Sequence, residues 1–214
     1  MRKWNFCAGP AVISEEVLSE VQSELLEFPN SGSSIMEMSH RSKTYMNVAL
    51  DAKQDLKDIL KIPENYEILF LQGGATHQFS MIPMNFNHLS GSADYITTGT
   101  WTKKAFIEGS KIMDLKEIYS SEKNNFTCAP DIESLELSDN AAYVHYCPNE
   151  TIQGNAIHKV PKINKPLVAD MSSVILSEPL EVDNFSLIYA GAQKNIGPAG
   201  LTIVIIKKEF MEHG

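Results

Sequence analysis

Short apolar runs that alternate with helix-like stretches are the feature that most constrains the fold of this chain. Six runs between residues 66 and 208 have the length and the Val, Ile and Leu content of buried strands: YEILFLQ, ADYITTG, AAYVHY, PLVAD, SLIYAG and LTIVIIKK. Helical periodicity follows the first two of them, in ATHQFSMIPMNF and WTKKAFIEGSKI. Strands separated by helices or long crossovers predict an α/β fold with a mostly parallel sheet.

The first third of the chain reads instead as two amphipathic helices. Residues 14–28 place apolar side chains three or four positions apart, and Ser14 has the character of an N-cap. Residues 43–61 repeat the pattern, and Pro63 is expected to stop that helix. No composition shift marks an internal linker between these helices and the strands that follow.

Composition and charge exclude several classes of function. The formal net charge of -9 argues against nucleic-acid binding and against binding to an anionic membrane. No apolar run approaches the roughly 18 residues that span a bilayer, and the N-terminus lacks a signal peptide pattern. The three cysteines are widely spaced without a CxxC pair. We therefore expect a cytoplasmic protein, with neither a disulfide framework nor a metal site.

Small and polar residues follow most of the predicted strands. They are Gly73-Gly74, Thr98 to Trp101, Asn149 to Thr151, Asp170 to Ser173, and Gln193-Lys194. In open α/β sheets, ligands bind beyond the carboxyl ends of the strands. If these strands are neighbours, the five groups face one crevice.

Each group has an ordinary interpretation beside the functional one. Gly73-Gly74 is either a simple strand-to-helix turn or a site where free helix amides bind a phosphate. Trp101 is either a core residue or a surface for stacking on a planar ligand. Asp170 either caps the next turn or pairs with a protonated ring nitrogen.

Two groups of basic residues are equally open when taken alone. Lys194 is either an exposed loop lysine or a desolvated amine, which is more easily neutral and then attacks an aldehyde. His40 and Arg41 are either a solvated helix start or a clamp for an anionic substrate. Glu150 and His145 could be imagined as an acid/base pair, but their spacing does not favour one, and we assign them no role.

Taken together, these residues match the needs of one cofactor. A lysine that forms a Schiff base, a carboxylate for the ring nitrogen, an aromatic side chain for the ring and a helix N-terminus for the phosphate make up a pyridoxal phosphate site. The combination predicts such a site more specifically than any single residue does.

The sequences of these motifs also resemble those of the phosphoserine aminotransferases, a family of fold-type I pyridoxal phosphate enzymes. The resemblance runs from residue 5 to about residue 208. It rests on NFCAGPAVI, MEMSHRSK, LFLQGGATHQF, SDNAAYVHYCPNETIQG, ADMSSVILS and YAGAQKNIGPAGLTIVI. It implies a three-layer α/β/α large domain over residues 15–214, preceded by an N-terminal arm over residues 1–14.

The resemblance also implies roles for individual residues. Lys194 would carry the Schiff base and move the proton, and Asp170 would pair with the pyridinium nitrogen. The remaining cofactor contacts would come from Trp101 on the ring, Thr151 on the ring hydroxyl, and Ala75, Thr76, Ser172 and Gln193 on the phosphate. Arg41, helped by His40, would bind the anionic group of the substrate.

The implied reaction moves an amino group from L-glutamate to 3-phosphohydroxypyruvate. It gives O-phospho-L-serine and 2-oxoglutarate, in serine biosynthesis and in many bacteria also in pyridoxine biosynthesis, by a homodimer. Family members continue into a small C-terminal domain that this chain does not contain. A non-catalytic remnant that still binds cofactor, and a related pyridoxal phosphate enzyme with another substrate, are therefore the alternatives.

Overall fold

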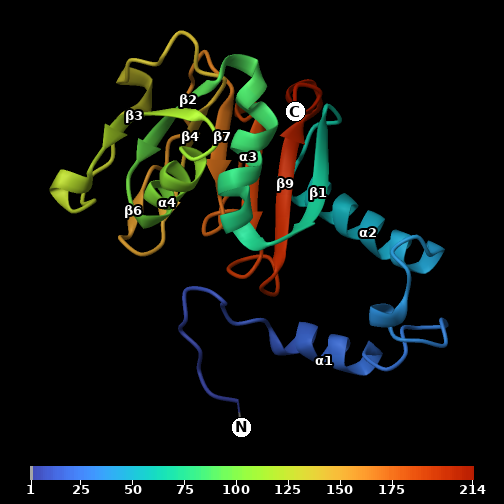
Figure 1. The fold of residues 1–214 in the computed structure, drawn as a ribbon. Helices are drawn as coiled ribbons and strands as arrows, with labels where there is room; N and C mark the ends of the chain where they lie inside the picture. The colour runs from blue at the N-terminus through green and yellow to red at the C-terminus, as the bar shows by residue number, and fades with distance from the viewer. Residues whose placement is uncertain (1) are drawn as a thin grey trace.

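A seven-stranded sheet forms the centre of the protein in the computed structural model, which describes residues 2–214 (Figure 1). The strands lie in the order β1-β9-β8-β7-β4-β2-β3. Their bounds are β1 Tyr66–Gln72, β2 Ser92–Thr97, β3 Asp114–Ser120, β4 Val144–Tyr146, β7 Leu167–Asp170, β8 Leu187–Gly191 and β9 Leu201–Lys207. A separate two-stranded hairpin pairs β5 (Asn149–Glu150) with β6 (Asn155–Ala156).

Helices and short 3₁₀ turns connect these strands. The α-helices are α1 (Glu15–Glu24), α2 (Lys43–Leu60), α3 (Gly74–Ser90), α4 (Thr100–Gly109) and α5 (Lys208–Met211). The 3₁₀ turns are η1 (Ile35–Glu37), η2 (Glu122–Asn124), η3 (Ile132–Ser134) and η4 (Val182–Asn184). None of the helices within residues 2–214 combines the length and the apolar character needed to cross a bilayer.

The sheet is mostly parallel, as predicted. The pairs β3-β2, β2-β4, β4-β7 and β7-β8 are parallel, whereas β9 runs antiparallel to both β8 and β1. The segment between β8 and β9 contains no helix. A parallel pair needs a crossover of roughly a dozen residues or more. The segment after β8 makes no such crossover, so the chain turns back directly and β9 pairs antiparallel with β8.

Two apolar clusters cover the two faces of the sheet. On one face, α3 packs Phe79, Ile82 and Phe86 against side chains of the central strands, and α4 packs beside α3. On the other face, Leu56 and Leu60 from the end of α2 join apolar residues of irregular segments. The strands between these clusters are buried on both sides, which explains their nearly continuous apolar sequences.

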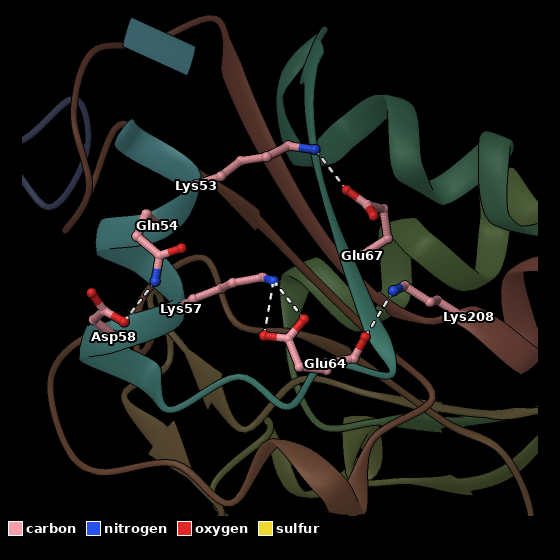
Figure 2. A network of polar contacts seen from close by, with 7 residues as sticks. All are labelled: Lys53, Gln54, Lys57, Asp58, Glu64, Glu67 and Lys208. Atoms are coloured by element: carbon pink, nitrogen blue, oxygen red, sulfur yellow. Dashed lines mark hydrogen bonds and ion pairs between the residues drawn. The ribbon is translucent and has the colours of Figure 1, made fainter. Parts of the chain in front are cut away.

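Polar contacts fasten α2 to the β1 edge (Figure 2). Nζ of Lys53 lies 2.6 Å from Oε1 of Glu67 on β1, and Nζ of Lys57 lies 3.3 Å from Oε2 of Glu64. Lys208, at the start of α5, donates to the backbone carbonyl of Glu64 at 2.8 Å. Glu64 and Glu67, around the start of β1, are thus contacted by α2 from the first third of the chain, and Glu64 also by α5 at its end.

Several element bounds differ from the predictions. Ser14 does cap α1, accepting from the amide of Val17, but the helix ends at Glu24 rather than at residue 28. Phe28 precedes Pro29, and the residue before a proline disfavours helical geometry. The helix predicted from residue 101 to 112 ends at Gly109. The edge strand β3 was not predicted, because its sequence DLKEIYS is polar, as exposed edge strands tend to be.

The N-terminal arm and α1 run beneath one end of the sheet in Figure 1. No residue of α1 is buried, and its apolar stripe remains exposed, at Val17, Leu18 and Val21 and onward to Leu25. The arm touches the rest of the chain near the end of the sheet, where the amide of Ala11 donates to the carbonyl of Gln193 at 2.7 Å. The domain boundary at residue 14 stays a prediction.

Candidate active site

One pocket lies beyond the carboxyl ends of the strands and gathers the polar groups that follow them. All eight residues predicted to bind the cofactor line it: Ala75, Thr76, Trp101, Thr151, Asp170, Ser172, Gln193 and Lys194. Gly74, Phe79, Cys147, Asn149 and Ser173 complete the lining. These residues follow five different strands, so the predicted crevice is confirmed.

Lys194 projects from the turn that follows β8 and is partly buried. Its amine donates to Oγ1 of Thr151 and lies 5.4 Å from the centre of the Trp101 ring. The arm passes close to its side chain, because a Cβ atom built on Gly9 would lie 3.0 Å from Cγ of Lys194. The lysine is therefore enclosed by a hydroxyl, an indole and the arm.

Asp170 ends β7 and is almost fully buried, with 4% of its surface exposed. Its Oδ1 accepts from the amide of Ser172 at 3.0 Å and from the hydroxyl of Ser172 at 2.6 Å. Burial raises the pKa of the Asp170 carboxyl, while the Ser172 hydrogen bonds and the charge of Lys194 act in the opposite direction. Asp170 thus caps its turn and also faces the pocket, and its pairing with a ring nitrogen stays a prediction.

The N-terminus of α3 is open toward the pocket. Gly73 and Gly74 have φ angles of 96° and 66°, in the left-handed region that favours glycine, and no side chain caps the helix there. The first amides of an α-helix have no partner within the helix, and the helix dipole makes this end electropositive. The amides at Ala75 and Thr76 are therefore suited to hold an anion such as a phosphate.

The N-terminus of α4 is closed by the carboxylate of Glu150, to which the sequence assigned no role. Oε2 of Glu150 accepts from the amide of Trp101 at 3.0 Å, and Oε1 accepts from the amide of Thr102 at 2.9 Å and from its hydroxyl at 2.6 Å. Glu150 is fully buried. The signal available in the sequence was indirect: α4 begins after Gly99, which has no side chain to cap a helix.

His40 and Arg41 are not brought to this pocket. Both are exposed, just before α2, and neither is among the pocket residues of its own chain. The backbone amide of Arg41 donates a hydrogen bond to the hydroxyl of Ser39 at 3.2 Å. Their role in substrate binding remains a prediction.

His145 belongs to a buried row of rings on the α3 face of the sheet. Its Nε2 lies 2.9 Å from the hydroxyl of Tyr189, and its ring stacks on Tyr95 with the centroids 4.6 Å apart. Tyr189 pairs in register with Asp170 on the neighbouring strand. Burial lowers the pKa of His145 to about 3, so the imidazole is neutral at physiological pH. It is a structural neighbour of Asp170 and not a pocket residue.

These residues fit pyridoxal phosphate on three observations. The α3 amides are uncapped, the buried Asp170 carboxylate has no ion pair among the described residues, and the Lys194 amine faces an indole. They supply a phosphate site, a partner for a ring nitrogen and an amine for an aldehyde. Within residues 2–214, no group of three or more His, Cys, Asp or Glu side chains is placed to hold a metal ion.

Comparison with known proteins agrees with this geometry. The sequence profile described as aminotransferase class-V matches residues 3–213. The chain belongs to the aminotransferase class-V family. The phosphoserine aminotransferase of Hahella chejuensis is 49% identical over 211 residues, which are 98% of this class-V chain and 58% of that protein.

Solved structures of other class-V members are similar throughout. The phosphoserine aminotransferase from Bacillus circulans subsp. alkalophilus superposes with a TM-score of 0.94 at 45% identity, over 99% of this chain and 59% of that one. The pyridoxal phosphate-bound phosphoserine aminotransferase from Trichomonas vaginalis gives 0.88 at 39% identity, over 99% and 60%. The resemblance drawn from the motifs and the predicted fold class are both confirmed. The chain spans about three fifths of the length of these relatives.

Proposed function

We propose that this chain is the cofactor-binding part of a phosphoserine aminotransferase. The enzyme would transfer an amino group from L-glutamate to 3-phosphohydroxypyruvate, giving O-phospho-L-serine and 2-oxoglutarate for serine biosynthesis. The observation that carries the proposal is the position of Lys194, which shares one pocket with Asp170, Trp101 and Thr151 beside the uncapped end of α3.

Residues of the pocket have distinct tasks in holding the cofactor. The α3 amides at Ala75 and Thr76, with Ser172 and Gln193, hold the phosphate. Thr151 hydrogen-bonds the ring hydroxyl, and Trp101 covers the ring on one side. All six line the pocket.

Two charged groups carry the reaction. When bound, pyridoxal phosphate supplies an aldehyde for an amine to attack and a ring that accepts the electron pair left on the substrate carbon. Asp170 holds a proton on the ring nitrogen, because a buried carboxylate strongly favours a cationic partner over water. Lys194 would hold the cofactor through its aldehyde, and its free amine would serve as the base that moves the proton at the substrate α-carbon.

Substrate recognition is assigned to Arg41, with His40. Because both side chains are exposed and lie outside the pocket of their own chain, this assignment requires a second copy that brings them to it. We therefore propose a homodimer in the cytoplasm, with the anionic substrate bound by the arginine fork. A role in pyridoxine biosynthesis would use the same transfer on another phosphorylated substrate.

Borohydride reduction of the protein with pyridoxal phosphate tests the site. We expect a reduced adduct on Lys194 by peptide mass spectrometry and its loss in Lys194→Ala, with Lys162→Ala as the exposed-lysine control. An adduct on another lysine would overturn the assignment.

A competition assay tests the substrate: a related pyridoxal phosphate enzyme would show no preference for the phosphorylated keto acid over its unphosphorylated analogue. Phosphohydroxypyruvate-dependent release of 2-oxoglutarate would exclude a non-catalytic remnant.

A further inference from the structure

The carboxylate of Glu150 is buried without a cationic partner. None of its surface is exposed, and none of the ion pairs found among residues 2–214 includes it. A buried charge is costly unless hydrogen bonds replace its hydration. Here three donors do so, and all three belong to the first turn of α4, in Trp101 and Thr102.

This arrangement is a cap supplied from another part of the chain. Gly99 precedes α4 and offers no side chain, so the amides of the first turn need an outside acceptor. A carboxylate is the preferred group there, because the helix dipole is positive at this end. Gly99 itself makes room for it, since a Cβ at that position would lie 2.4 Å from Cδ of Glu150.

The whole β5-β6 hairpin turns toward the same turn of α4. Gln153 accepts from the amide of Thr100 at 3.1 Å and donates to its hydroxyl at 2.7 Å. Asn155 donates to the carbonyl of Thr98 at 3.3 Å. Three side chains of one hairpin therefore hold the start of α4. Glu150 and Gln153 accept from its first amides, and Asn155 contacts the chain between β2 and α4.

The same hairpin also reaches the lysine. Thr151, the residue after Glu150, accepts from the Lys194 amine, whereas Glu150 accepts from the Trp101 amide. Two successive residues thus contact the amine of Lys194 and the backbone amide of Trp101, whose ring lies 5.4 Å from that amine.

We infer that Glu150 is a positioning residue that holds Trp101 in place against the pocket through the first turn of α4. The inference rests on the proposed function for its ligand, pyridoxal phosphate. It requires that the negative charge and both carboxylate oxygens are needed, because Trp101 and Thr102 present amide donors to different oxygens. A glutamine at this position has one acceptor oxygen, and its amino group would face a donor.

The experiment uses Trp101 as its own reporter. The chain has two tryptophans, so Trp4→Phe leaves Trp101 as the only one. Trp4 is 91% exposed on the arm, and its replacement removes no core packing. Glu150→Gln and Glu150→Ala are compared with Glu133→Gln, a carboxylate that accepts from Lys159 and Lys162 away from the pocket. For each protein, we would measure the emission spectrum of Trp101, its quenching by acrylamide, and the dissociation constant of pyridoxal phosphate from visible absorbance.

We expect both Glu150 variants to move the Trp101 emission to longer wavelength and to increase its quenching by acrylamide. Pyridoxal phosphate should bind about tenfold more weakly in Glu150→Gln, the change that corresponds to one lost charge-assisted hydrogen bond. Glu133→Gln should match the parent in every measurement. Emission, quenching and affinity that all stay at parent values in folded Glu150→Gln would overturn the inference.

The controls separate this inference from the proposed function. At saturating pyridoxal phosphate, the borohydride adduct of Glu150→Gln should still form on Lys194. An adduct on another lysine in the parent protein defeats the proposed function, while the Trp101 emission still decides the role of Glu150. If Glu150→Ala does not fold, Glu150→Gln keeps the shape of the side chain and carries the test. A role in stability alone would lower the unfolding midpoint and leave the emission of the folded protein unchanged.

Discussion

The Lys194 amine donates to the hydroxyl of Thr151 and at the same time lies 5.4 Å from the centre of the Trp101 ring. The hydrogen bond fixes where the amine points before any ligand arrives. A ligand that reacts with the amine meets it already oriented, at a lower cost in conformational entropy.

Removing this acceptor should weaken cofactor binding. We expect Thr151→Val, which keeps the side-chain shape, to bind pyridoxal phosphate about tenfold more weakly, the effect of one hydrogen bond of about 1.4 kcal/mol. Absorbance titration measures the change, with Thr44→Val on α2 as the control. Equal affinities for the Thr151 variant and the parent would show that the hydroxyl does not orient the lysine.

A side chain at Gly9 should displace Lys194. A Cβ there would already lie 3.0 Å from Cγ of the lysine, so the branched side chain of Gly9→Val forces that chain to move. We expect a slower and less complete borohydride adduct on Lys194, by roughly tenfold in rate. Mass spectrometry after timed reduction measures it, and Ala8→Val, at the exposed neighbouring position, is the control. An unchanged rate would mean that the arm does not restrain the lysine.

His145 should destabilise the protein in acid. Its pKa is about 3 in the folded chain against 6.5 for the free side chain, so the unfolded chain takes up a proton first as the pH falls below 6.5. The penalty is about 1.4 kcal/mol for each pH unit between these values, hence about 2 kcal/mol at about pH 5. His145→Gln cannot titrate and should show a flatter loss of stability between about pH 7 and pH 5 in urea unfolding.

The exposed His158 provides the comparison for that measurement. His158→Gln changes an exposed side chain outside the core and should follow the parent protein across the same pH range. If His145→Gln also follows the parent, the buried imidazole is not the origin of the acid sensitivity.

The Lys53-Glu67 pair in Figure 2 should contribute little, and only above acidic pH. The hydrogen bond from Lys53 lowers the pKa of Glu67 below 4.5. Its contribution is therefore present above about pH 4.5 and is lost as the pH falls further. Glu67→Gln should cost only about 0.5 kcal/mol at neutral pH, because both side chains are about one-third exposed, and progressively less as the pH falls below 4.5. Glu64→Gln, at a carboxylate 89% exposed, should cost less, and a larger loss there would contradict this ranking.

The exposed stripe of α1 should mediate self-association. Val17, Leu18 and Val21 lie together on a helix that buries none of its residues. Exposed apolar stripes of this kind are typical of interfaces. We expect Val21→Glu to weaken the dimer at least tenfold by light scattering over a concentration series, and Gln22→Glu on the neighbouring position to leave it intact. A parent protein that is monomeric at high concentration would contradict the proposal.

The sequence alone determined six of the seven strands of the central sheet and the eight cofactor-binding candidates that line the pocket. Apolar runs such as SLIYAG record burial on both faces, and this information is local to each run. Because parallel strands end at the same edge, the residues after them were bound to meet, and Lys194, Asp170 and Trp101 do. The edge strand β3 escaped prediction since it carries no such apolar signal.

Only the tertiary structure decided which side chains from distant parts of the chain form hydrogen bonds with one another. Glu150 caps α4 from 49 residues away from Trp101, and Tyr189 reaches His145 from 44 residues away. The reversal of β9 and the position of His40 and Arg41 outside the pocket also depend on how distant segments pack. The local sequence sets the periodicity of each element and local caps such as Ser14 on α1. Long-range partners such as Glu150 are set by which elements the buried core brings together.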